Sequence, residues 1–181
     1  MTQLLDGIRQ VREALEKKDS LALKELSSGL AGDSFLLQDP SLLELSLVSY
    51  ALNKFLTKPY IFKTKEWALF SKKTVKLLDA SEKALDSGQE SKAREAVHSI
   101  LSEIQKLSDS LGRFVSSVLD KARLKAGAEI YAKGASLGQA SFLSGADKRE
   151  LSFYIGSTRL SDQFESMPLK QRIDQTMELF G

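Results

Sequence analysis

The stretch that decides the fold is residues 64–111, TKEWALFSKKTVKLLDASEKALDSGQESKAREAVHSILSEIQKLSDSL. In both halves of this stretch the apolar residues recur every three or four positions, which places them on one face of an α-helix. Gly88 lies between the halves and is expected to end the first helix in a left-handed conformation. A connection this short predicts an antiparallel helical hairpin, with Thr64–Ser87 packed on Gln89–Leu111.

The same periodicity continues toward the N-terminus. It predicts a helix through Leu4–Leu15, a short second helix capped by Asp19 or Ser20, and a third helix over Pro40–Thr57. An aspartate before a proline favours the start of that third helix, because proline at the first helical position loses only an unused donor. The glycines of Gly29–Asp33 favour a loop between the second and third helices.

Toward the C-terminus the pattern changes from long helices to short ones. We expect a helix that Asp109 or Ser110 caps and Gly134 ends, with a buried face formed by Phe114, Val115, Val118, Leu119, Ala122, Ala126 and Ile130. Two short helices then follow, over Leu137–Ser144 and from Asp147 to Gly156.

The fold class follows from these patterns. Strand signals are confined to the short runs PYIFK and SFYIG, and the second of these fits a helix better. We predict an all-α fold, a multi-helix bundle of about eight or nine helices that ends in a helix-turn-helix-like segment. Residues 1–134 would form the bundle, and residues 135–181 would hold that segment and a last helix, packed on the bundle as one compact unit.

Composition excludes several kinds of site. At 181 residues, with 42% in the hydrophobic class, a chain buries about 70% of its unfolded surface and needs no disulfide or metal to build a core. The absence of cysteine excludes disulfides, thiolate zinc sites and cysteine nucleophiles. The single histidine, His98, lies on an apolar helix without two further good ligands nearby, so we interpret it as structural.

Motifs for nucleotide or acyl chemistry are missing as well. GLAGD lacks the lysine of a P-loop, and no GxSxG elbow occurs. We therefore predict a non-enzymatic protein without a cofactor or a metal. An enzyme or a small-molecule sensor with a pocket between the bundle helices is the distant alternative. Residues 1–19 alternate apolar and charged positions, unlike a signal peptide, and no run is apolar enough for a membrane span, so a cytoplasmic location is expected.

The segment SLGQASFLSGADKREL, residues 136–151, carries the one recognition motif. Ser136 and Asp147 can cap two short helices, and Gly145 can form the turn between them. Ala140 or Ser141 is small enough for a close crossing, and Leu151 can fill the angle between the helices. Leu137, Leu143 and Ile155 are the further core candidates.

This segment resembles the helix-turn-helix of small archaeal regulators and antitoxin-like proteins, in which a run like SLGxAAxLxGVSxxEL is common. The longer run from residue 121 to residue 162 also looks like uncharacterised archaeal all-helical proteins. The likeness to the helix-turn-helix segments covers about 25 of the 181 residues, and Ala146 stands where their motif has valine. It implies a duplex-DNA contact, but no particular target.

If the motif binds DNA, its second helix would lie in the major groove. Lys148, Arg149 and Ser152 would then face base edges or phosphates, and Gln139 and Arg159 would contact the backbone. The alternative is that the two helices serve only to pack the fold, as they do in many three-helix arrangements.

Charge is unevenly distributed although the whole chain is only +2. Residues 121–159 hold seven basic and three acidic residues, and residues 54–76 hold seven lysines against Glu66 alone, which gives +4 and +6. Residues 1–53, 77–120 and 160–181 sum to −3, −3 and −2. Such segregation favours an anionic partner or self-association.

The block 54–76 is a second candidate site because aromatic residues interleave its lysines. This pattern suits single-stranded nucleic acid or an anionic membrane surface, and its candidate residues are Lys63, Lys65, Lys72 and Lys73. We favour the other interpretation, in which the aromatics are core and the lysines are solvated, since Trp67 and Phe70 have helical spacing.

The tail of the chain completes the predictions. Pro168 is expected to open a last helix, whose apolar stripe would be formed by Leu169, Ile173, Thr176, Met177 and Phe180. This stripe would dock on the core or cross to a second subunit, and a homodimer would bring two recognition helices to two half-sites. The leading hypothesis is a protein that binds double-stranded DNA or another protein. The second is an interaction or assembly module without affinity for nucleic acid.

Overall fold

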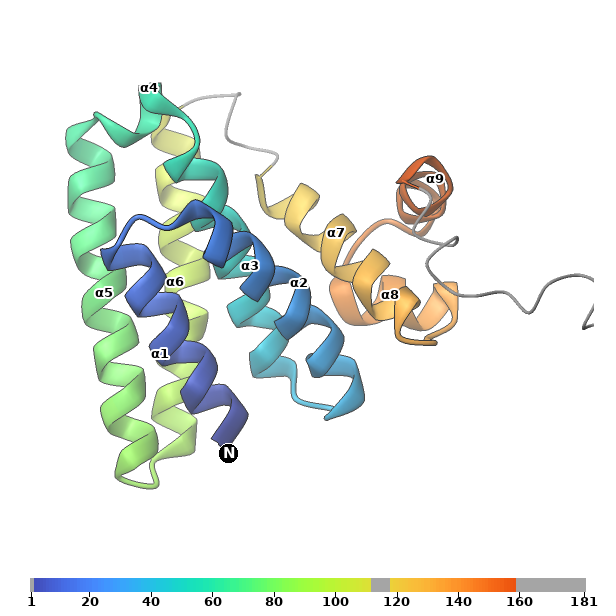
Figure 1. The fold of residues 1–181 in the computed structure, drawn as a ribbon, viewed down its shortest axis with the longest axis horizontal. Helices are drawn as coiled ribbons and strands as arrows, with labels where there is room; N and C mark the ends of the chain where they lie inside the picture. The colour runs from blue at the N-terminus through green and yellow to red at the C-terminus, as the bar shows by residue number, and fades with distance from the viewer. Residues whose placement is uncertain (1, 112–117, 159–181) are drawn as a thin grey trace, which may run out of the picture.

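A computed structural model describes residues 2–111 and 118–158, and in these residues the chain forms nine helices and no strand (Figure 1). The predicted all-α class is therefore confirmed. In chain order the helices are α1 (Thr2–Glu16), α2 (Ser20–Leu36), α3 (Pro40–Leu56), α4 (Pro59–Phe62), α5 (Lys65–Asp86), α6 (Glu90–Leu111), α7 (Val118–Ala132), α8 (Leu137–Ser144) and α9 (Lys148–Thr158).

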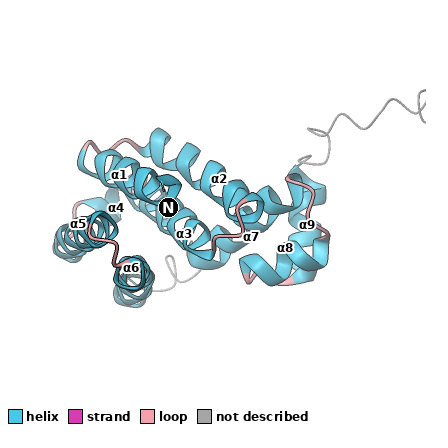
Figure 2. Ribbon diagram, turned by 90° about the horizontal axis from the view of Figure 1, so that it is seen from below, coloured by secondary structure: helices cyan, strands magenta, loops and turns pink. Residues whose placement is uncertain are grey.

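The helices are arranged from one end of the molecule to the other. The antiparallel hairpin of α5 and α6 forms one end, with α1 packed along α5, and α2 and α3 form the middle (Figure 1). Helix α7 lies against α2 and α3 and carries α8 and α9 at the opposite end, which the second view also shows (Figure 2). Helix α7 therefore connects the bundle to the two short helices α8 and α9.

Predicted caps and turns account for many of the helix ends. The carboxylate of Asp19 accepts a hydrogen bond from the amide of Ala22, and that of Asp39 accepts one from the amide of Ser41, each at 2.9 Å. Gly88 has a φ of +73°, so the left-handed turn of the hairpin is confirmed.

One prediction near the N-terminus was wrong. The expected loop at Gly29–Asp33 does not exist, because α2 continues through both glycines to Leu36. Glycine in a helix costs about 0.5–1 kcal/mol relative to alanine, but Leu30 and Ala31 are buried here and hold the helix together. At Gly32 an added Cβ would lie 2.7 Å from Cε of Lys133, the far end of a flexible side chain that can move aside.

Other boundaries also differ from the sequence predictions. Asp109 and Ser110 lie inside α6 and do not start a new helix, and the run PYIFK, from Pro59, holds the short helix α4. Helix α9 runs through Gly156 to Thr158. Phe114, Val115, Arg159 and the helix predicted after Pro168 lie outside the described residues.

The bundle core is built around large aromatic side chains. The ring of Phe55 is fully buried, and its centroid lies 5.9 Å from that of Trp67 and 5.8 Å from that of Phe70, both in edge-to-face geometry. Such pairs contribute about 0.5–1.5 kcal/mol beyond their burial. Phe55, Trp67 and Phe70 of the lysine-rich block therefore belong to the core, as the spacing of Trp67 and Phe70 indicated, whereas Tyr60 of the same block is exposed.

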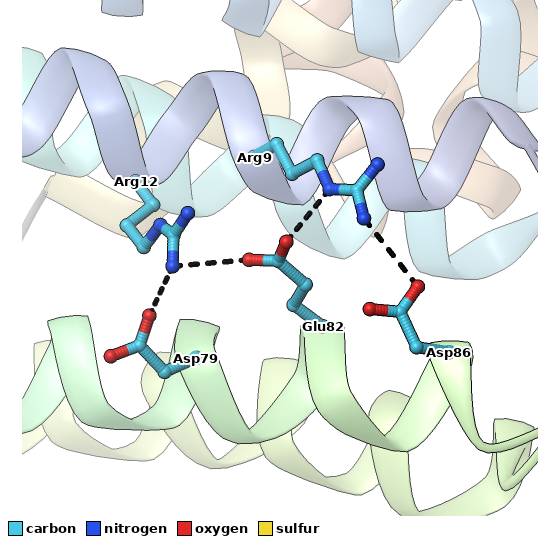
Figure 3. A network of polar contacts seen from close by, with 5 residues as sticks. All are labelled: Arg9, Arg12, Asp79, Glu82 and Asp86. Atoms are coloured by element: carbon cyan, nitrogen blue, oxygen red, sulfur yellow. Dashed lines mark hydrogen bonds and ion pairs between the residues drawn. The ribbon is translucent and has the colours of Figure 1, made fainter.

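A network of charges joins α1 to α5 across the surface of the bundle (Figure 3). Nε of Arg9 lies 2.7 Å from Oε1 of Glu82, and a terminal nitrogen of Arg9 lies 3.4 Å from the carboxylate of Asp86. Arg12 pairs with Asp79 and also with Oε2 of Glu82, the latter at 3.1 Å. These charges are therefore paired with one another within the chain, although Arg12 Nε and Glu82 Oε2 are buried without a hydrogen-bond partner.

Within the two described ranges, no helix combines the length and the apolar composition that a membrane span requires.

Candidate nucleic-acid interface

The motif begins with a well-formed cap on α8. The Ser136 hydroxyl accepts a hydrogen bond from the amide of Gln139 at 3.2 Å, and the Gln139 side-chain oxygen accepts one from the amide of Ser136 at 3.0 Å. This reciprocal pair fixes where α8 starts. It also places Gln139 on the surface with its side-chain oxygen already bonded.

The turn between α8 and α9 is tight. Gly145 has a φ of +68°, a conformation in which residues other than glycine are strained. The Ser141 hydroxyl donates to the carbonyl of Ala146 at 2.8 Å and closes the turn. The Asp147 carboxylate then accepts from the amides of Arg149 and Glu150, each at 2.9 Å, so α9 starts at Lys148.

The inner face of α9 is fixed against α7 by small residues. Leu151 is fully buried and Ile155 nearly so, and they pack in a cluster with alanines of α7, α8 and the turn. At Gly127 of α7 an added Cβ would lie 2.7 Å from Oγ of Ser144 and 3.0 Å from Cδ1 of Leu151. Only glycine allows α8 and α9 to approach α7 this closely.

The outer face of α9 holds three of the predicted contact residues together. Lys148, Arg149 and Ser152 are all exposed at the N-terminal half of the helix. Among the residues that the structure describes, neither Lys148 nor Arg149 forms an ion pair. Gln139 is exposed on α8. These cations remain available for an external anion.

Two exposed aromatic rings were not predicted from the sequence. Phe142 of α8 is 85% exposed and Phe153 of α9 is 80% exposed. Leu143, a predicted core residue, is also exposed, because α8 buries the face that carries Ala140 and Ser144 instead. Phe153 lines a shallow groove between α7 and α9 with Arg149 and the half-buried Tyr154. Burial, and secondarily Glu129, raises the pKa of Tyr154.

The second predicted patch has a different character. Lys63, Lys65, Lys72 and Lys73 are all exposed. Nζ of Lys73 lies 2.9 Å from Oε2 of Glu103, so this lysine is neutralised by α6. Since the rings of Trp67 and Phe70 are buried beneath the helix, they offer no platform on which bases could stack.

His98 has a partner that the sequence did not suggest. Its Nδ1 lies 2.9 Å from Oε1 of Glu44 on α3, so the pair joins α3 to α6 across the surface. Nearby, Arg94 donates to the Ser41 hydroxyl at 2.6 Å and to the Asp39 carboxylate at 2.9 Å. In the described part of the chain, no three histidine or acidic side chains gather in a way that could hold a metal.

This chain matches no protein-family model, no curated protein and no solved structure.

Proposed function

We propose that the protein is a non-enzymatic regulator that binds double-stranded DNA through α8 and α9. The observation that carries the proposal is the exposed side of α9, where Lys148, Arg149 and Ser152 reach solvent while Leu151 and Ile155 fix the adjacent face of the helix in the core. A helix held in this way can enter a major groove without losing its packing.

Each exposed residue has a chemistry that suits this role. Lys148 and Arg149 can bind phosphates or the acceptor edge of guanine, and Ser152 can hydrogen bond to a base. An exposed phenylalanine suits the methyl group of thymine, which explains an exposed ring at Phe153. Gln139, at the start of α8, would contact the backbone.

Binding to duplex DNA would also determine where the protein acts and in which oligomeric state. We expect a cytoplasmic protein, where duplex DNA lies in archaeal cells, and a homodimer, since two copies of α9 would bind two half-sites. Light scattering on the full chain measures the oligomeric state, and a monomer in the presence of its DNA site would contradict the dimer.

The test uses the full chain and a library of random duplexes selected at low salt. The variant Lys148→Ala/Arg149→Ala is expected to weaken binding of the selected duplex at least about tenfold and to reduce the salt slope by about two, if both cations contact phosphates. The matched control, Lys63→Ala/Lys72→Ala, removes the same charge from the second patch and should leave binding unchanged.

Two results would contradict the proposal. The first is that no duplex is enriched over a scrambled sequence. The second is that binding survives in Lys148→Ala/Arg149→Ala and disappears in Lys63→Ala/Lys72→Ala. The second result would move the anion site to the start of α5.

The exposed rings favour a second candidate function. Phe142 and Phe153 can anchor a protein partner, because aromatic residues concentrate binding energy at interfaces. In that case Phe142→Ser/Phe153→Ser would abolish self-association or partner binding, and Lys148→Ala/Arg149→Ala would have little effect on either.

A further inference from the structure

A groove of about 560 Å³ lies between α1 and α2, which are joined by a short turn and packed side by side (Figure 1). Its lining on α2 extends from Ala22 to Asp33, which is about 16 Å of helix at 1.5 Å per residue. Its lining on α1 is formed by Gln10, Glu13, Ala14 and Lys17. The groove therefore follows α2 for about three helical turns.

The floor of the groove is apolar. Ala14 and Leu30 are buried, and Ala22 and Leu26 are half-buried. Because two of these four side chains are single methyl groups, apolar surface of both helices stays open to solvent between them. This surface is continuous with the bundle core, since Ala14, Leu30, Ala22 and Leu26 all belong to it or pack against it.

Gly29 also lines the groove, and packing within the described chain does not require it. At Gly7 of α1 an added Cβ would lie 3.0 Å from Cδ2 of Leu30, so that glycine lets the two helices approach. At Gly29 an added Cβ would meet nothing within 4 Å, although glycine weakens a helix interior relative to alanine. This cost is accounted for if another molecule lies against Gly29.

The rim of the groove is acidic. It carries four carboxylates, those of Glu13, Asp19, Glu25 and Asp33, against the one ammonium of Lys17. Nζ of Lys17 lies 2.5 Å from Oε1 of Glu13, so this lysine is already paired. Neither Glu25 nor Asp33 forms an ion pair with a described residue. The rim therefore attracts cations and repels nucleic acid.

An apolar floor between two helices, with carboxylates along its edges, is complementary to an amphipathic helix that carries basic residues. We propose that the groove between α1 and α2 binds a basic amphipathic helix of a partner protein. The apolar residues of that helix lie on Leu26 and Leu30 and against Gly29, and its lysines or arginines pair with Glu25 and Asp33. This interaction goes beyond DNA binding by α9 and does not depend on it.

The first measurement titrates the full chain into a fluorescent synthetic peptide of about four helical turns, with leucine on one face and lysine on the others, and follows anisotropy. Saturable binding at low salt is expected, because the leucines cover the floor and the lysines pair with the rim. A matched peptide with glutamate in place of lysine should bind at least about tenfold more weakly, since the rim repels it.

The decisive variant is Gly29→Leu. Its side chain enters the groove and should weaken binding of the lysine peptide at least about tenfold. The variant should keep or raise Tm, because leucine favours a helix more than glycine does and space is open at this position. Gly156→Leu makes the same change in α9, where an added Cβ also meets nothing within 4 Å, and should bind the peptide as the native chain does.

The acidic rim is tested by removing charge without changing shape. Glu25→Gln/Asp33→Asn should weaken binding of the lysine peptide about threefold to tenfold and reduce its dependence on salt, because exposed charge pairs are screened. Glu66→Gln/Glu150→Gln removes the same number of charges from exposed positions outside the groove and should leave both quantities unchanged.

The proposal is overturned if Gly29→Leu binds the lysine peptide as tightly as the native chain does, or if the two peptides bind equally well. It is also overturned if light scattering shows that the native chain self-associates and Gly29→Leu does not, because the groove then holds a second copy of the chain. Duplex binding separates this proposal from the function of α9. Gly29→Leu should bind DNA as the native chain does, and Lys148→Ala/Arg149→Ala should bind the peptide as the native chain does.

Discussion

The two ends of the molecule differ in how their arginines are paired. In the bundle of α1, α5 and α6, each described arginine pairs with a carboxylate, as in the Arg9, Arg12 and Glu82 network, although lysines such as Lys72 have no ion pair among the described residues. In the described residues of α7, α8 and α9, the one ion pair is Arg123 with Asp120, at 3.2 Å. Charges paired within the fold serve structure, whereas cations left unpaired on a rigid helix are suited to an external ligand.

The apolar residues show the same contrast. The bundle buries large rings such as Phe55, whereas α8 and α9 pack through glycine, alanine and serine and leave Phe142 and Phe153 in solvent. Small residues bring helices close together, and rings outside the core are then available to a partner. Four changes test whether this contrast holds.

The largest effect is expected where a buried ring is removed. Phe55→Ala should lower the free energy of unfolding by about 3–5 kcal/mol, because it leaves a cavity among aromatic neighbours. Phe142→Ala should change it by less than about 0.5 kcal/mol, since that ring is exposed. Urea unfolding measures both. An equal cost at Phe142 would mean that its ring is covered in solution.

A smaller effect is expected at Gly127. Gly127→Ala places a methyl group against Ser144 and Leu151 and should destabilise the α7–α9 packing by about 1–3 kcal/mol. Amide hydrogen exchange should increase in α8 and α9 and stay unchanged in α5 and α6. The matched control is Gly29→Ala, where the added methyl meets nothing within 4 Å and the gain in helix propensity is up to about 1 kcal/mol. Uniform destabilisation of the whole chain would contradict local packing.

A modest effect should appear in the acid dependence of stability. Hydrogen bonds from Lys106 and Lys73 lower the pKa of Glu103. The stability that ionised Glu103 contributes is therefore fully present above the ordinary carboxyl pKa of about 4.3. It is lost as the pH falls through the lower pKa of Glu103 in the folded state. Glu103→Gln should flatten the fall of Tm below that pH. Glu150→Gln, which removes a carboxylate without an ion pair in the described chain, should leave the fall as it is.

The smallest effect concerns the turns. Gln38 at the α2–α3 turn has a φ of +53°, while the α8–α9 turn has a glycine in the same conformation. Gln38→Gly should stabilise the protein by about 0.5–1 kcal/mol, because it removes left-handed strain. Gly145→Ala should destabilise it by a similar amount. Calorimetry measures both changes, and opposite signs would show that neighbouring contacts outweigh backbone conformation.

Local signals predicted much of the fold. Several features depend only on residues that are close in sequence, so the sequence could predict them. These are the hairpin, the caps at Asp19 and Ser136 and the turn at Gly145. The helix through Gly29 and Gly32 could not, because the burial that outweighs the glycine cost comes from other helices.

The candidate sites divide in the same way. Periodicity placed Lys148, Arg149 and Ser152 on one helix, and their exposure agrees with that placement. The exposed state of Phe142 and Leu143 was missed, since an apolar residue in a short helix carries no sign of which face the neighbours cover. The His98 and Glu44 pair was also missed, because its partners are distant in the chain.

The amino-acid sequence by itself determined the helical class, most helix ends and the two basic segments, because helix periodicity, capping and charge are local properties. Only the tertiary structure decided which charges are neutralised and which stay free. It buried the rings of Phe55, Trp67 and Phe70 in the 54–76 block and left that of Tyr60 exposed, and it neutralised Lys73 of that block through Glu103 of α6. The physical reason is that electrostatic interaction and burial depend on distances in space, which are set only when α7 packs on α2 and α3.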